Sequence, residues 1–160
     1  MNWSPSEWEL CAIILGIFTG LLGMGFGIYT IHHQQFLTIH QYMAALEDPE
    51  FIKAREHLYN IQGTIPLEDE KVSLVVNFYH HWGFMARRGY LPLWVFDYGF
   101  GPGTLRMCEM TAEYINACRE KHGDLTYAEN VTWLHHKLKK RQKRKGWGTS
   151  RKKKLSAQSV

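Results

Sequence analysis

Cysteine is scarce in this chain, and its three cysteines are far apart. Cys11 belongs to an apolar N-terminal stretch, whereas Cys108 and Cys118 lie much later in the chain. No CxxC pair occurs, so a structural zinc ribbon is not predicted. An odd and sparse set does not suggest a disulfide framework, so we expect reduced thiols in a cytoplasmic domain.

Charged side chains are missing from Leu10 to Ile31, a run of 22 residues. As a helix this run would be about 33 Å long, close to the roughly 30 Å hydrocarbon core of a bilayer. The first ten residues hold no Lys or Arg, and no A-x-A site follows the run, so a cleaved signal peptide is not favoured. We predict an uncleaved transmembrane helix over residues 10–31.

Basic residues are also absent before Lys53, which bears on the orientation of the predicted helix. Because Lys and Arg favour the cytoplasmic side, the chain after the helix is predicted to be cytoplasmic, with residues 1–9 outside the membrane. Trp3, Trp8 and Tyr29 suit the aromatic belts at the two interfaces. The predicted location is a bacterial inner membrane, crossed once.

The apolar run carries five glycines within "GIFTGLLGMGFG", residues 16–27. A phosphate-binding loop is not predicted, because neither GxGxxG nor GK[ST] is matched. On a helical wheel, four of the glycines fall within about 60° of one another, and Gly25 lies opposite. Small residues let helices approach closely in lipid, so this face is a candidate for self-association or for a partner helix. The candidate helix-packing residues, hereafter the glycine stripe, are Ala12, Gly16, Gly20, Gly23, Gly27 and Thr30.

Acidic residues are missing after Glu129, and the basic ones gather near the C-terminus. Of 19 Lys and Arg residues, eleven lie in residues 137–154, whereas residues 1–136 carry a net charge of −7. Three interpretations stay open: an ordinary solvated tail, attraction to anionic lipid headgroups, and phosphate contacts with nucleic acid in which Trp147 stacks on a base. The candidate binding residues are Lys137, Lys139, Lys140, Arg141, Lys143, Arg144, Lys145, Trp147, Arg151, Lys152, Lys153 and Lys154.

No alternation typical of β-strands is present, and the apolar spacing after the anchor is helical. The predicted class is therefore all-α: a transmembrane helix, a compact cytoplasmic helical domain over residues 32–138, and a basic disordered tail over residues 139–160. The first helix is expected to continue to Leu46. The further predicted elements are helices over 49–61 and 68–88, a short helix or turn over 92–98, a helix over 104–121 and a last helix from Thr126.

Motifs for catalysis or metal binding are also lacking. The nine histidines include three adjacent pairs but no HxxxH or HExxH, and neighbours on a helix diverge by 100°. The serines lack a GxSxG context. Asp97 lies among aromatic residues, and we expect a structural ion pair there with Arg87, Arg88 or Arg106. No enzyme activity, cofactor or metal is predicted.

Three segments carry a resemblance to a known family: "GFMARRGYL", "PLWVFDYG", and "YINACREKHGD" leading to "NVTWLHHKL". Over roughly residues 40–138 the chain resembles a bacterial family of small single-pass membrane proteins with a helical cytoplasmic domain of unknown function. The resemblance implies an architecture and no activity. The leading functional prediction is a membrane-anchored interaction or sensing module. The alternatives are a membrane-perturbing effector, for instance in phage defence, and a membrane-tethered nucleic-acid binder.

Overall fold

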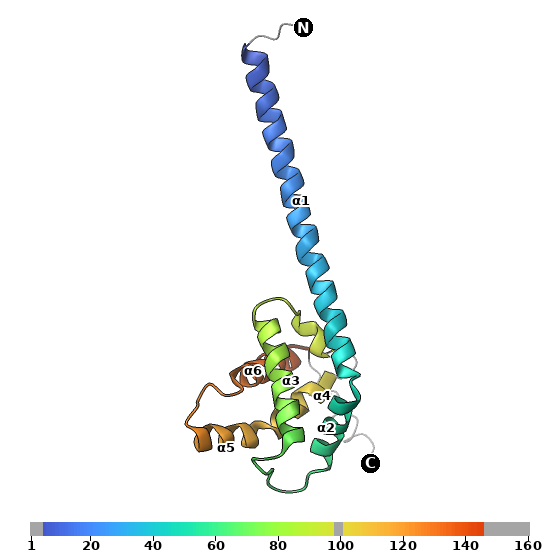
Figure 1. Ribbon diagram of the computed structural model, residues 1–160, viewed down its shortest axis with the longest axis vertical. Helices are drawn as coiled ribbons and strands as arrows, with labels where there is room; N and C mark the ends of the chain where they lie inside the picture. Colours follow the sequence, from blue (N-terminus) through green and yellow to red (C-terminus); the bar gives the residue numbers. More distant parts are fainter. Residues whose placement is uncertain (1–4, 98–100, 146–160) are drawn as a thin grey trace, which may run out of the picture. The chain divides into compact units, whose positions relative to one another are not determined.

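The computed structural model describes residues 5–97 and 101–145, which form six α-helices and one 3₁₀ helix (Figure 1). This part of the chain contains no strand, which confirms the predicted all-α class. The elements are α1 (Pro5–Leu46), α2 (Pro49–Asn60), α3 (Glu70–Arg87), the 3₁₀ helix η1 (Leu93–Asp97), α4 (Gly101–Met110), α5 (Ala112–His122) and α6 (Glu129–Lys145).

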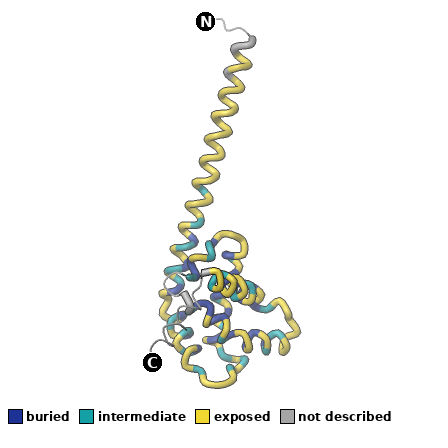
Figure 2. The backbone as a smooth tube through the Cα atoms, turned by 180° about the vertical axis from the view of Figure 1, so that it is seen from behind, coloured by how far each residue is buried: buried dark blue, intermediate teal, exposed yellow. Residues whose placement is uncertain are grey.

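The chain divides into two units, residues 1–38 and residues 39–160. α1 contributes to both, because this single helix runs on to Leu46 as predicted. Along the first unit the side chains of the apolar run are exposed, whereas the buried residues gather in the second unit (Figure 2). Each unit is therefore described separately below.

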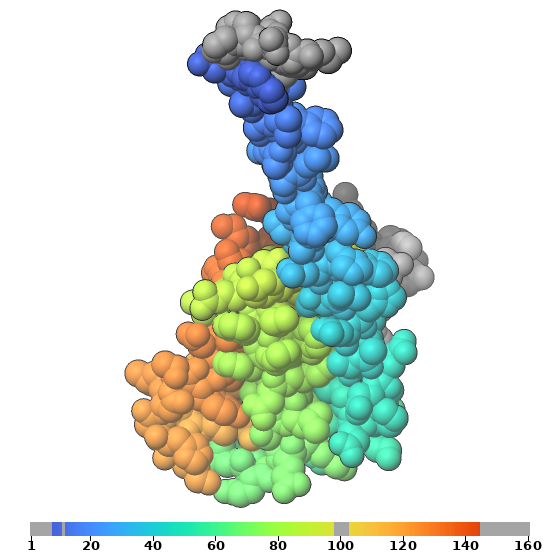
Figure 3. Space-filling model, turned by 45° about the horizontal axis from the view of Figure 1, so that its top comes forward, coloured from blue at the N-terminus to red at the C-terminus, as the bar shows by residue number. Residues whose placement is uncertain are grey.

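α3 is the central helix of the second unit and packs against both α2 and α6. Its apolar positions recur every three or four residues, so they form one continuous inner face. Its outer side lies on the surface between α2 and α5 (Figure 3). The buried residues of this helix are Val72, Val75, Val76, Tyr79, Trp82, Gly83 and Ala86.

Aromatic side chains from several elements meet at one end of this core. Tyr42, from the last turns of α1, is 1% exposed and meets Trp82 edge-on with ring centroids 5.2 Å apart. Phe96 of η1 lies 5.2 Å from the same tyrosine ring. Phe51 of α2 stacks on Phe78 of α3 at 3.8 Å. Such ring pairs add to the free energy gained from apolar burial, so they fix η1 and the end of α1 against α3.

Local caps set several helix ends, close to the predicted ones. The Asp48 carboxylate accepts hydrogen bonds from the amides of Glu50 and Phe51, at 2.8 and 3.1 Å, and caps α2. Asp69 caps α3 by accepting from the Val72 amide at 3.0 Å. Gly123 takes a left-handed conformation, with φ at +65°, directly after α5.

The single helix predicted over residues 104–121 is wrong, because the structure divides it at Thr111 into α4 and α5. The Thr111 hydroxyl donates to the Met107 carbonyl at 2.9 Å, a bond that is known to bend helices. Ala112, the residue after the bend, is exposed. Cys108 and Cys118 thus belong to different helices, and both are buried free thiols.

The last helix begins at Glu129 rather than at the predicted Thr126. Asp124 accepts hydrogen bonds from both the amide and the hydroxyl of Thr126, at 2.8 and 2.6 Å, which holds a turn in place. Ala128 follows with φ at +53°, a left-handed conformation that few non-glycine residues adopt. The turn and this residue delay the start of α6.

Candidate interaction surfaces

The glycine stripe lies on an open face of α1. A Cβ built on Gly16, Gly20, Gly23 or Gly27 would meet no neighbouring atom within 4 Å. The Thr30 hydroxyl donates to the Phe26 carbonyl at 2.9 Å, so this polar group is satisfied within its own helix. Nothing among the described residues covers the stripe, and another helix backbone could approach it closely.

The other faces of the first unit of α1 carry exposed apolar side chains. Phe26 is 72% exposed and Leu15 is 67% exposed, and their apolar neighbours are similar. Thr19 also donates its hydroxyl within the helix, to the Leu15 carbonyl at 2.8 Å. By length and composition α1 could cross a membrane. Exposed apolar surfaces of this extent are typical of segments that contact lipid or another protein.

The basic residues from Lys137 to Lys145 lie on α6, including the first seven residues of the predicted tail. Two positions in this stretch face inward: Leu138 is 4% exposed, and the Arg141 side chain packs against η1. The outward side chains are those of Lys137, Lys139, Lys140, Lys143 and Arg144. The predicted contacts of Trp147, Arg151, Lys152, Lys153 and Lys154 lie outside the described residues.

Asp97 pairs with Arg141, whose Nε donates to Oδ2 at 2.5 Å. The predicted partners were wrong because each makes a different contact. Arg87 donates to the Glu129 carboxylate at 3.0 Å, while Arg88 lies over the Phe84 ring and Arg106 over the Tyr59 ring. Arg141 therefore has a structural role in holding α6 to η1, whereas Lys137, Lys139, Lys140, Lys143 and Arg144 face outward.

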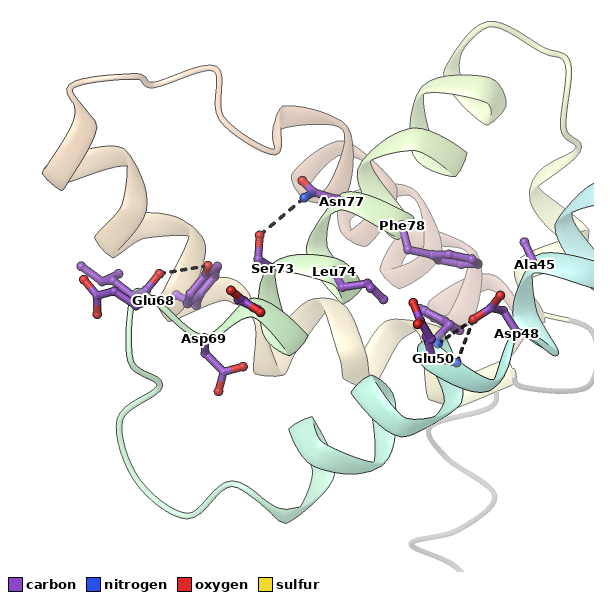
Figure 4. Close-up of a pocket in the computed structure, with 13 residues that line it drawn as sticks. Ala45, Asp48, Glu50, Glu68, Asp69, Ser73, Leu74, Asn77 and Phe78 are labelled. Carbon is purple, nitrogen blue, oxygen red and sulfur yellow. Dashed lines mark hydrogen bonds between the residues drawn. The ribbon is translucent and has the colours of Figure 1, made fainter.

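A groove of about 710 Å³ runs along the outer side of α3 (Figure 4). Residues of α3 form its floor. Ala45 and the start of α2 line one end, and Leu67 and Tyr114 line the other. Carboxylates lie at both ends, and apolar side chains lie between them. The charged lining residues are Asp48 and Glu50 at one end and Glu68 and Glu70 at the other. The apolar side chains between them are Leu74 and Phe78.

The carboxylates of the groove differ in how they are held. Asp69 pairs with Nε2 of His57 at 2.8 Å. Burial raises the pKa of Asp69, but the hydrogen bond with His57, the bond from the Val72 amide and the charge of His57 outweigh burial and lower it. The hydrogen bond from Lys121, at 2.7 Å, lowers the pKa of Glu68. Both groups are therefore anionic at neutral pH, and the groove is negatively charged.

Sequence reasoning missed this groove. Glu68, Asp69 and Glu70 lie at the start of the helix predicted over 68–88, and nothing local connects them with Asp48. The available signal was the net charge of −7 over residues 1–136, which predicts an acidic surface without locating it.

Burial keeps three titratable side chains of the second unit, those of Cys108, Tyr79 and Tyr42, in their neutral forms. Burial raises the pKa of the Cys108 thiol to about 12, and the nearby Glu109 charge adds to this effect. Burial likewise raises the pKa of Tyr79, and that of Tyr42. A protonated thiol is a poor nucleophile, so Cys108 is a core residue in this structure.

The histidine pairs do not converge on a common point. Within the described residues, no group of three His, Cys, Asp or Glu side chains is placed to hold a metal ion. His80 lies 3.3 Å from the Asn130 amide, His135 lies 3.6 Å from the Glu109 carboxylate, and His33 stacks on the Tyr29 ring. Each of these histidines has a separate structural neighbour.

The predicted resemblance to a bacterial membrane family stays a prediction. Comparison of the chain with protein-family models, with curated proteins and with solved structures gives no match.

Proposed function

We propose that this protein is a non-enzymatic, single-pass membrane protein that self-associates through the glycine stripe of α1. The observation that carries the proposal is the open face of that helix, where a Cβ built on any of the four glycines would meet no atom within 4 Å beyond the adjoining backbone of the helix. A second copy could bring its own stripe against this face, because glycine lets two helix backbones pack closely in lipid.

The second unit would then act as an interaction or sensing module on the cytoplasmic side of an inner membrane. The outward basic residues of α6 and those that follow it would attract anionic lipid headgroups, each contributing about 1 kcal/mol near the surface. Lipid is the favoured polyanion over nucleic acid, because the apolar helix would hold the basic residues near a bilayer.

Gly20→Ile and Gly23→Ile test self-association, with Gly25→Ile as the matched control on the opposite face. All three substitutions add the same side chain to open space, so none should disturb the single helix. Energy transfer between labelled full-length copies would be measured while the protein is diluted in phosphatidylcholine bilayers. We expect the two stripe variants to weaken association at least tenfold and the control to leave it unchanged. Equal behaviour of all three variants would refute the stripe as the contact surface.

A further inference from the structure

The groove along α3 is negatively charged at both ends and apolar between them, and the proposed function does not use it. The carboxylates of Glu50 and Glu70 make no ion pair with any described residue. Leu74, between them, is 37% exposed. A groove of about 710 Å³ is large enough to hold an aromatic side chain with its flanking backbone.

We propose that this groove binds the basic segment of residues 145–154 of the same chain. In that segment, "KGWGTSRKKK", Lys145 precedes the single aromatic Trp147, and a run of four basic residues, 151–154, follows it. The order of charge, apolar group and charge is the complement of the groove. Because burial of an aromatic ring and pairing of charges would act together, the segment fits better than an evenly basic peptide.

The dimensions of the two partners agree. Glu70 and Phe78 are eight residues apart on α3, so the floor between them is about 12 Å long. Lys145 and Arg151 are six residues apart and span at most about 20 Å when extended. The glycines on both sides of Trp147 let this stretch shorten to the length of the groove.

Contacts through the aromatic core connect the last turns of α6, just before the segment, with a residue that lines the groove. Arg141 pairs with Asp97 of η1, and the next ring, Phe96, lies 5.2 Å from Tyr42. The Tyr42 ring is in turn 6.0 Å from Phe78, which lines the groove. A short chain of direct contacts therefore joins the end of α6 to the groove within one molecule.

Zero-length crosslinking tests this binding with the full chain in a nonionic detergent at low salt. A carbodiimide joins a lysine Nζ to a carboxylate as an amide only when the two groups touch. We expect amides from Lys152, Lys153 or Lys154 to the carboxylate at one end of the groove, either Glu50 or Glu70, to exceed those to the exposed Glu113 and Glu120 of α5 at least fivefold. Equal yields at the two pairs of glutamates would overturn the proposal.

Two variants separate docking from simple charge attraction. Trp147→Ala should lower the groove crosslinks at least fivefold, whereas Leu155→Ala, the matched control, should leave them unchanged. Both substitutions leave residues 39–145 intact in sequence, so loss of the fold would not explain a difference. An unchanged yield in Trp147→Ala would overturn the proposal, as would crosslinks that join only ¹⁵N-labelled to unlabelled copies. The detergent contains no anionic lipid, so failure here leaves the proposed lipid binding unaffected.

Discussion

At the scale of single residues, Gly83 sets how closely α3 can approach α6. A Cβ at this position would lie 2.8 Å from the backbone carbonyl oxygen of Asn130 and 3.2 Å from its carbonyl carbon. Both are backbone atoms of a packed helix, which cannot rotate away as a flexible side chain would. The absence of a side chain at Gly83 is therefore a packing requirement of this crossing.

Gly83→Ala should lower the free energy of unfolding by about 1–3 kcal/mol, the usual cost of overpacking. Alanine is the better helix former by about 1 kcal/mol, so without the close contact the same change would stabilise the protein. Urea unfolding followed by near-ultraviolet circular dichroism would report the aromatic core. Lys71→Ala, at an exposed position of the same helix, is the control. A stability above that of the unaltered protein would show that the contact is absent.

The pair of Asp69 and His57 predicts how stability depends on pH. Because the pKa of Asp69 is lowered from its ordinary value of 3.8, folding favours the ionised carboxylate. The stabilisation is fully present above about pH 5 and is lost as the pH falls through the lowered pKa. Asp69→Asn keeps an oxygen that can cap α3 but cannot titrate, so its stability should change less between about pH 5 and pH 2. Unfolding measured over this range, with exposed Glu113→Gln as the control, checks the difference in slope.

At the scale of elements, the ion pair of Arg141 and Asp97 holds the last turns of α6 to η1. Both side chains are partly buried, so solvent screens the pair less than a surface one. Arg141→Ala should cost about 1–2 kcal/mol, as hydrogen bonds to charged groups do. Hydrogen exchange should then quicken about tenfold in the last two turns of α6. Arg144→Ala, at an exposed position, should leave exchange in the rest of the helix unchanged; an equal effect of both variants would contradict the role of the pair.

Helix ends that depend on local chemistry could be predicted from the sequence. Asp48 before Pro49, Gly89 after α3 and Gly123 after α5 act through their own backbone neighbours, and the predicted ranges 49–61, 68–88 and 104–121 begin or end within one or two residues of them. Thr111 and Ala128 were missed for a physical reason. A buried threonine can either bend a helix or continue it, so Thr111 did not predict a break. Alanine rarely adopts a left-handed conformation, so Ala128 gave no sign of the one it adopts.

Contacts between distant segments could not be predicted from the sequence at all. Arg141 and Asp97 are 44 residues apart in the sequence. The predicted partners of Asp97 were arginines much nearer to it in the sequence. The groove needs α2, α3 and α5 together, so its carboxylates have no common local pattern. The glycine stripe was predictable because it lies on one helix, where residue spacing alone fixes the face.

At the scale of the whole molecule, the charge is divided between an acidic body and a basic end. Residues 1–136 carry a net charge of −7, and the eleven basic residues of 137–154 follow with no acidic residue among them. Removing everything from Lys137 onward would also remove Leu138, which is 4% exposed, and Arg141 with its ion pair. A test of lipid binding therefore has to neutralise charges beyond α6 and leave the helix intact.

Trypsin cleavage of the full chain in nanodiscs would measure that binding. About 30% phosphatidylglycerol should slow cleavage at the basic residues 151–154 about tenfold relative to phosphatidylcholine alone, because each basic group contributes roughly 1 kcal/mol near an anionic surface. Raising the salt to 0.5 M should restore cleavage by shortening the range of the attraction. Changing Lys152, Lys153 and Lys154 to Gln should remove the slowing at Arg151, whereas the same change at the exposed Lys53 and Lys71 should not.

The groove and the lipid would compete for the same basic residues, and the background of Glu50→Gln with Glu70→Gln separates their effects. Docking in the groove protects the segment in both kinds of nanodisc and is lost in this background. Lipid binding protects it only when phosphatidylglycerol is present, and the ratio of the two cleavage rates should grow once the groove no longer competes. Equal rates in the two membranes, in that background and at low salt, would exclude anionic lipid as the ligand of the basic end.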